Sequence, residues 1–271
     1  MALYTLHERP PVEAPVLAVH LEGWIDAGSA GSGAMNALLN TLDVAPVASF
    51  HVDHLLDQRA RRPVLQVVNG VNTALSWPKI QLVTAKDRAG RDLLLLHGPE
   101  PDFQWRAFAR DVRDLGIDLG VRLVVGLGAF PSPAPHTRPA PIVCAASDAD
   151  LAKAVGFIPG TQEVACSMQA VLERGFAGAG VPAVGLWARV PHYAAPAPYP
   201  AACLALVECL ARLGGLDLDV AELKAAAEEH RQQLDLLVAT NPEYAALVQR
   251  LESDQDGALA DEVERFLRGE E

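Results

Sequence analysis

Aromatic residues and positive charge are both scarce in this sequence. Phe, Trp and Tyr make up 6% of 271 residues, whereas hydrophobic residues as a whole make up 50%. The core must therefore be built mainly from Ala, Val and Leu. The formal net charge is −12. Because an acidic surface repels phosphate backbones and anionic lipid, we expect neither a nucleic-acid partner nor a membrane partner.

Long apolar runs are missing as well. No run reaches the roughly 18 residues that a membrane-spanning helix needs. Residues 1–15 hold three prolines and two glutamates and no apolar signal core. We therefore expect a cytoplasmic protein.

The motifs of metal and nucleophile chemistry are also lacking. The four cysteines form no Cys-x-x-Cys pair, so we expect no metal, no disulfide framework and no cofactor. No Gly-x-Ser-x-Gly elbow and no His-Glu-x-x-His motif occurs. The sequence therefore indicates no catalytic nucleophile.

Short apolar runs alternate with helical patterns over the first 200 residues, which predicts an α/β domain with a parallel or mixed sheet. The predicted strands are 16–21, 47–52, 64–68, 74–83, 92–97, 122–127, 142–146 and 183–190. Helical patterns follow Gly33, Asp102 and Thr161, and the last two residues stand where N-caps belong. Five prolines make 130–141 a loop.

Strand signals end near Tyr199, and four narrow apolar stripes of helical spacing follow. Asn241-Pro242 and Asp256-Gly257 are predicted breaks between helices, which favours antiparallel helix hairpins. We therefore divide the chain into an α/β domain, residues 1–215, and a helical extension, residues 216–271. The extension must pack on itself, on the domain or on a second subunit.

Five segments stand in a particular order along the chain. They are Gly23-Trp-Ile-Asp-Ala-Gly28, Asp57-Gln-Arg-Ala-Arg-Arg-Pro63, Gly98-Pro-Glu-Pro-Asp102, Pro135-His-Thr-Arg-Pro139, and Val190-Pro-His-Tyr193 with Tyr199-Pro200. Together they resemble motifs of the proteasome assembly chaperone 2 family, in its bacterial branch. Gln58 stands where the family usually has Tyr.

The resemblance implies a phosphorylase/hydrolase-like α/β fold, in which a central mixed sheet lies between helices. It also implies self-assembly, commonly as trimers, and kinship with factors that help to build proteasome rings. It implies no known reaction.

A glycine-rich turn after the first strand is the first candidate ligand site. Gly28 begins a segment whose free backbone amides could hold an anion at a helix N-terminus, or could serve close packing alone. Asp26 precedes it at the end of a strand, where open α/β sheets place ligands. The alternative for Asp26 is a turn brace that accepts backbone N–H bonds.

Further candidates follow other strands. Glu100 and Asp102 could divide acid and base roles, or Asp102 could cap a helix. His136 and Arg138 share the proline-rich loop, which could present them to a ligand or be tied down by an internal pair. His192 ends the last strand, where packing is the alternative to a site.

A local basic cluster is the candidate partner contact. Arg59 and Arg62, with Arg61 between them, could recognise an acidic partner or form ion pairs within an oligomer. We expect the chain itself as one partner, in a trimer, and a protein client as another.

Two functions remain open from the sequence. The first is a non-enzymatic, chaperone-like assembly or scaffold protein. The second is a small-molecule protein for a nucleoside or an anion, either a binder or a hydrolase- or phosphorylase-like enzyme. The second rests on analogy of fold. A pocket lined jointly by Asp26, Glu100, His136 and Arg138 would favour the small molecule, and internal pairing of these residues would favour the scaffold.

Overall fold

The computed structural model describes residues 2–23 and 25–267, with side chains as far as residue 254. The strands are β1 (Tyr4–Leu6), β2 (Val16–Glu22), β3 (Ala45–Phe50), β4 (Val64–Val68), β5 (Val71–Ser76), β6 (Gln81–Lys86), β7 (Asp92–Pro99), β8 (Leu123–Ser132), β9 (Ile142–Ala146) and β10 (Ala183–Pro191). The helices are α1 (Ala30–Thr41), α2 (Val52–Leu55), α3 (Trp105–Asp118), α4 (Ala149–Val155), α5 (Met168–Gly178), α6 (Pro200–Gly214), α7 (Ala221–Thr240) and α8 (Pro242–Leu267).

An 8-stranded mixed sheet forms the centre of the molecule, in the order β1-β3-β6-β7-β2-β8-β10-β9. The four inner strands β7, β2, β8 and β10 are parallel, and antiparallel strands flank them on both sides. Buried strands of this kind read as continuous apolar runs, as in Val16–Glu22, because both faces are covered. The predicted α/β class with a central mixed sheet is therefore confirmed.

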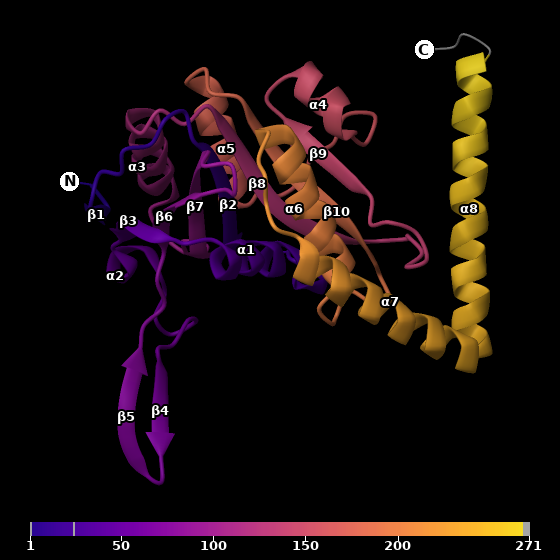
Figure 1. Ribbon diagram of the computed structural model, residues 1–271, viewed down its shortest axis with the longest axis horizontal. Coiled ribbons are helices and arrows are strands. Elements are labelled where there is room, and N and C mark those ends of the chain that lie inside the picture. The colour runs from indigo at the N-terminus through magenta and orange to yellow at the C-terminus, as the bar shows by residue number, and fades with distance from the viewer. Residues whose placement is uncertain (1, 24, 268–271) are drawn as a thin grey trace.

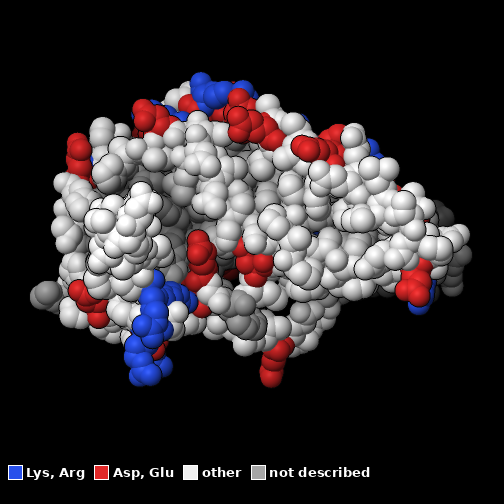
Figure 2. Space-filling view, turned by 90° about the horizontal axis from the view of Figure 1, so that it is seen from below, with Lys and Arg blue, Asp and Glu red and all other residues white. Residues whose placement is uncertain are grey.

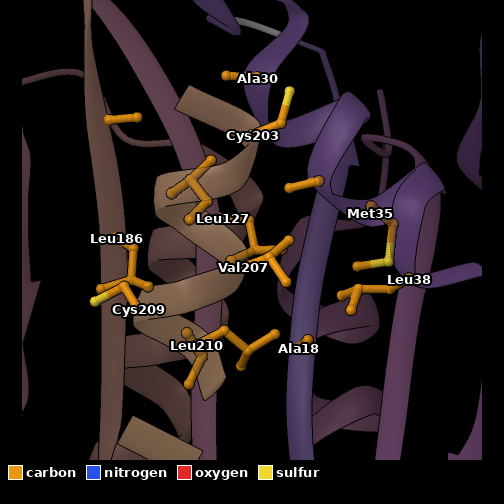
Figure 3. Close-up of a cluster of buried hydrophobic side chains, with 14 of the residues drawn as sticks. Ala18, Ala30, Met35, Leu38, Leu127, Leu186, Cys203, Val207, Cys209 and Leu210 are labelled. Atoms are coloured by element: carbon orange, nitrogen blue, oxygen red, sulfur yellow. The ribbon is translucent and has the colours of Figure 1, made fainter. Parts of the chain in front are cut away.

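Helices cover the two faces of the sheet separately (Figure 1). On one face, α1 and α6 pack over side chains such as Ala18, Leu127 and Leu186 (Figure 3). On the other face, α3 and α5 pack over Val124, with Phe108 and other buried side chains. Aliphatic side chains predominate in both layers, as the low aromatic content predicts.

Several predicted boundaries are wrong. Strand β8 runs to Ser132, into the loop predicted at 130–141, and three other differences have a physical reason. The helix expected from Thr161 begins at Met168, because the Ser167 side chain and not Thr161 caps it. Asp102 does not cap α3, because it bonds to Arg61 and to the Asp57 N–H instead. The strand predicted at 74–83 is two strands, since Pro78 has no N–H for a sheet ladder.

The C-terminal region also departs from its prediction. The break at Asn241-Pro242 is present, but α8 runs without a break across Asp256 and Gly257. A single glycine costs a helix interior only about 1 kcal/mol, which neighbouring turns can offset. Helix α8 leads away from the end of α7 and does not fold back along it as an antiparallel hairpin (Figure 1). The stripe predicted at Leu259, Val263 and Phe266 lies outside the described side chains.

A two-stranded hairpin of β4 and β5 projects from the body beside α2 (Figure 1). Every residue of both strands is exposed. Seen from the hairpin's side, much of the molecular surface carries neither acidic nor basic side chains (Figure 2).

Within the described residues, none of the helices combines the length and the apolarity that a membrane crossing requires.

Candidate functional site

The predicted site residues follow the carboxyl ends of the parallel strands. Asp26 comes after β2, Glu100 after β7, His136 after β8 and His192 after β10. Ligands of open α/β sheets bind at this edge, so the common position is the basis for a shared site. The side chains nevertheless enter different networks.

Asp26 braces the start of α1. Its Oδ1 accepts the N–H of Gly31 at 2.7 Å, and its Oδ2 accepts the N–H and the hydroxyl of Ser32 at 3.0 and 2.6 Å. The ring of His20 reaches the same group, with Nε2 3.0 Å from Ser32 Oγ and Nδ1 2.9 Å from the carbonyl oxygen of Leu127. A carbonyl only accepts, so Nδ1 carries the proton of that bond. Asp26 thus has the geometry of a turn brace, which was the alternative to a ligand site.

Two glycines allow this arrangement. A Cβ on Gly31 would lie 2.5 Å from His20 Nδ1, so only glycine leaves room for the imidazole. Gly28 has φ of +62°, and a Cβ there would lie 2.6 Å from Tyr199. The glycine-rich turn therefore serves close packing, while its N–H groups at 28 and 31 bond to Ala195 and Asp26.

Glu100 and Asp102 do not act on a common group. Glu100 is buried, and its Oε1 accepts the N–H of Met168 at 2.5 Å, at the start of α5. Asp102 pairs with Arg61. Burial alone would raise the pKa of Asp102, but the hydrogen bonds from Arg61 and from the Asp57 N–H lower it more, so its pKa lies below the usual value. Glu100 therefore holds the start of α5, and Asp102 holds the segment from Asp57 to Arg61.

His136 and Arg138 line a cavity of about 410 Å³ between the proline-rich loop and helices α6 and α7. His136 is buried. Its backbone N–H and its ring Nδ1 both contact the hydroxyl of Tyr193, at 2.8 and 2.7 Å. Its Nε2 lies 3.3 Å from Oδ1 of Asp235 on α7. Helix α7, the first helix after residue 215, therefore forms one wall of the cavity.

Two further aromatic groups shape this cavity. The rings of Tyr199 and His230 lie edge to face with centroids 5.6 Å apart. Burial, and then the charge of His136, lower the pKa of His230, and burial raises the pKa of Tyr193. His192 is exposed and packs its ring against Tyr193, 5.5 Å between centroids, without lining the cavity.

The charged side chains of α6 and α7 that line the cavity have partners. Arg231 bonds to Glu228 and Asp235, and Lys224 pairs with Glu208 at 3.2 Å. Asp26 and Glu100 do not line it. The four residues that would define a joint small-molecule pocket are therefore split. Asp26 and Glu100 bond to backbone N–H groups elsewhere, whereas His136 and Arg138 line the cavity.

The basic cluster is divided in the same way. Arg61 pairs with Asp102, whereas Arg59 and Arg62 are exposed beside the hairpin. No group of three His, Cys, Asp or Glu side chains suited to a metal ion occurs in the part of the chain that the structure describes. Burial, and then the charge of Asp26, raise the pKa of Cys203 to about 12, so this thiol is a packing group.

Sequence reasoning missed His20, Ser32, His230 and Asp235. His20 looks like an apolar-strand residue, and its short distance to Ser32 arises only when α1 packs on β2. His230 and Asp235 stand in an ordinary amphipathic helix, and only the docking of α7 brings them to the loop. The one available signal for His230 was its place in the apolar stripe of that helix.

Relatives of this protein include several whose structures are solved. The PAC2 family profile matches residues 20–238. A Mycobacterium tuberculosis protein of unknown function is 36% identical, with a TM-score of 0.91, over 98% of this chain and 92% of that chain. A Mycobacterium tuberculosis proteasome-assembly chaperone homologue is 32% identical, with a TM-score of 0.79, over 86% of this chain and 99% of its own. Among curated proteins there is no match.

A more distant likeness concerns the fold alone. A Pyrococcus furiosus protein described as an archaeal proteasome activator is 18% identical, with a TM-score of 0.64, over 86% of this chain and 97% of its own.

Proposed function

The chain belongs to the PAC2 family, as its five motifs predicted, and we propose that it is a homo-oligomeric, chaperone-like assembly protein without a reaction of its own. A related protein is described as a proteasome-assembly chaperone homologue. We carry over only the kind of action, which is contact with other proteins. The self-assembly that we propose is a trimer.

The observation that carries this proposal is the uncovered hairpin. Its apolar side chains are 48% to 69% exposed, namely Val64, Leu65, Val67, Val68, Val71 and Leu75. No charged residue occurs from Val64 to Pro78. An isolated two-stranded hairpin is marginal in water, and exposed strand edges are normally protected by charges. A partner must therefore cover these strands.

A second copy of the chain fits this requirement better than a client alone. A client is present only at times, whereas a copy is always available at the same concentration. An apolar arm that was uncovered most of the time would promote aggregation. The exposed Arg59 and Arg62 at the base of the hairpin then lie near the same interface, where the surplus acidic surface can pair with them.

Light scattering coupled to gel filtration tests the proposal. At micromolar concentration the mass should be a multiple of 28.8 kDa, and three copies are expected. Leu65→Lys with Leu75→Lys charges a cross-strand pair of the hairpin and should reduce the mass to that of one chain, because a lysine side chain is costly to bury.

The matched control charges two positions on the body. Ile117→Lys with Leu236→Lys alters exposed apolar residues away from the hairpin and should leave the mass unchanged. A wild-type monomer at micromolar concentration contradicts the proposal. Equal loss of mass in both double variants would show that the hairpin has no special role.

A second candidate function is small-molecule binding at the His136 cavity. It is favoured by one observation, which is that two histidines, Tyr199 and Arg138 converge on one cavity of about 410 Å³. An unbiased metabolite screen on the wild-type protein and on a His230→Leu variant tests it. A metabolite bound by the wild type and lost in the variant would support this second function.

A further inference from the structure

A second cavity, of about 470 Å³, lies on the α5 side of the sheet, above β8, β10 and β9. Its walls are largely apolar and include Ile25, Phe130, Val143, Ile158 and Trp187. The loop that leads into α5 lies along one side of it. Among the lining residues, Glu173 of α5 is the only one with a carboxyl, ammonium, guanidinium or imidazole group.

The sheet is shaped around the carboxyl of Glu173. Gly126 of β8 and Gly185 of β10 are neighbours across the two strands. A Cβ on Gly126 would lie 2.3 Å from Glu173 Oε1, and one on Gly185 would lie 2.6 Å from either carboxyl oxygen. A side chain at either position would have to displace this carboxyl, so the two paired glycines leave space for it.

One oxygen of this carboxyl has no hydrogen bond of ordinary geometry. Glu173 Oε1 and Gln169 Nε2 are buried, and neither makes a hydrogen bond of ordinary geometry within the described residues. Burial raises the pKa of Glu173 to about 8, against a smaller lowering effect of the nearby Gln169 amide. Unpartnered buried polar atoms are rare and costly, so a carboxyl and an amide left together beside a cavity indicate a missing binding group.

A cation suits this carboxyl better than a neutral or an anionic group. The lining has no basic side chain, and the net charge of −12 draws cations toward the protein. The ring of Trp187, packed 2.8 Å from the Cβ position of Gly128, adds an aromatic wall, which attracts a cation at its face. When Glu173 ionises, the amide of Gln169 can donate to one side of it and an ammonium group to the other.

We propose that this cavity binds a small amine with an apolar body, whose ammonium group pairs with the carboxyl of Glu173. This site differs from the His136 cavity, which lies on the α6 and α7 side of the molecule. It does not depend on the proposed assembly function.

Proton linkage gives the proposal a distinct signature. Below its pKa Glu173 is protonated, so an ammonium group must displace the proton, and the affinity rises about tenfold per pH unit up to that pKa. The other titratable groups nearby are Cys144 of β9, whose pKa is itself raised by burial, and Cys166 of the adjoining loop. Strands β8 and β10 present glycines 126 and 185, and α3 meets α5 at Gly116 and Phe176.

Titration calorimetry with phenethylamine tests the site, with 2-phenylethanol as the uncharged comparator. From pH 6 to pH 8 the affinity for phenethylamine should rise at least tenfold, while that for 2-phenylethanol stays level. Measurements in buffers of different ionisation enthalpy should show release of about one proton per amine bound at pH 7. The unaltered protein alone can therefore decide the question.

Variants localise the effect. Glu173→Gln should reduce the affinity for phenethylamine at least tenfold and remove its pH dependence. The matched control Glu163→Gln removes an exposed carboxylate of the adjoining loop and should change neither. Equal affinity for the amine and the alcohol, no proton release, or unchanged binding in folded Glu173→Gln would each overturn the proposal.

Discussion

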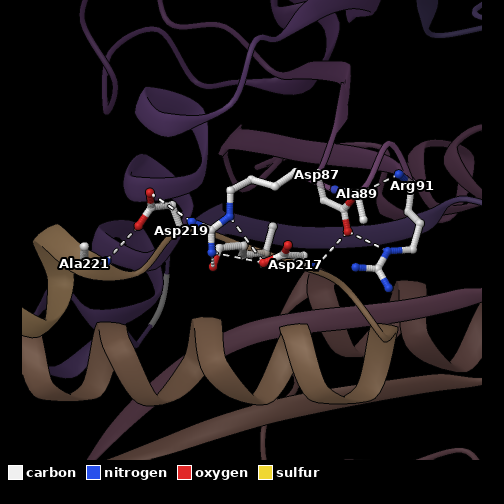
Figure 4. Close-up of polar contacts among 8 residues, drawn as sticks. Asp87, Ala89, Arg91, Asp217, Asp219 and Ala221 are labelled. Carbon is white, nitrogen blue, oxygen red and sulfur yellow. Dashed lines mark hydrogen bonds and ion pairs between the residues drawn. The ribbon is translucent and has the colours of Figure 1, made fainter.

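The carboxylate of Asp87 accepts a 2.7 Å hydrogen bond from the backbone N–H of Asp217, which is 130 residues later in the chain. Asp87 also accepts the N–H groups of Ala89 and Arg91 and a guanidinium N–H of Arg91 (Figure 4). One buried acid thus joins the turn between β6 and β7 to the segment that leads from α6 to α7. Arg88 of the same turn adds contacts to the carboxylate of Asp217.

Stability should depend on Asp87 in a pH-dependent way. Burial would raise its pKa, but the N–H groups of Asp217 and Arg91 lower it from 3.8 to about 2. The ionised form therefore stabilises the fold above pH 4, and this contribution is lost as the pH falls toward 2. Asp87→Asn should lower the free energy of unfolding at pH 7 by about 1–2 kcal/mol, and the loss should shrink at pH 2.5. Urea denaturation at both pH values measures it.

The control for Asp87 is an exposed acid in an ion pair. Asp118 pairs with Arg9, and both side chains are about 60% exposed. Asp118→Asn should change the free energy of unfolding by less than about 1 kcal/mol at either pH. An equal effect of the two variants at pH 7 would contradict the role of Asp87.

The hydroxyl of Tyr193 should hold the proline-rich loop in place. It contacts both the N–H and Nδ1 of His136. Tyr193→Phe keeps the ring and leaves a buried N–H unpaired, so we expect a loss of about 1–3 kcal/mol of stability. Hydrogen exchange of the amide of His136 should become faster. Tyr244→Phe, at an exposed tyrosine, is the control and should have neither effect.

Two glycines should respond to alanine with opposite signs. Gly31→Ala places a Cβ 2.5 Å from His20 and 2.8 Å from the carbonyl oxygen of Leu127, and should cost about 1–3 kcal/mol of stability. Gly175→Ala lies within α5 and meets no atom within 4 Å, so it should stabilise by about 0.5–1 kcal/mol through helix propensity. Thermal denaturation compares them. A neutral Gly31→Ala would mean that His20 moves freely.

The helices α7 and α8 should be dispensable for folding of the sheet domain. A chain that ends at Val220 keeps buried Leu216 and Leu218 and the bond from Asp217 to Asp87. It should give a cooperative thermal transition at a lower temperature, with an exposed His136. A chain that ends at Gly215 loses both leucines and should be weaker by a further 3–6 kcal/mol or so, at about 1.5–3 kcal/mol each. Circular dichroism follows both, and complete loss of folding after Val220 would show that α7 completes the core.

Part of the site could be predicted because its residues follow the strand ends. Apolar runs such as Val16–Glu22 and Ala183–Pro191 identify buried parallel strands, and the residues just after them are then known to share one edge. That reasoning placed His136 and Arg138, which line one cavity. It could not tell that Asp26 and Glu100 turn toward the backbone of α1 and α5.

Local signals failed where a distant group competes for the same side chain. Asp102 was predicted to cap α3, but Gln104 stands at the N-cap, and Arg61 is near enough in the folded chain to pair with the Asp102 carboxylate. Glu173, whose Oε1 is buried, gave no signal either, since a glutamate in an amphipathic helix is ordinarily solvated. Its meaning depends on the two glycines of β8 and β10 that face it.

The α/β class, the family motifs and the change to helices after Tyr199 follow from the sequence, because each depends on periodicity or on residues close together in the chain. The packing of distant segments determines which acid meets which base, that α7 lines the His136 cavity, and that both strands of the Val64–Ser76 hairpin are exposed. These outcomes depend on distances between segments up to 131 residues apart. Burial, which decides the charge of Glu173, is likewise a property of the packed molecule.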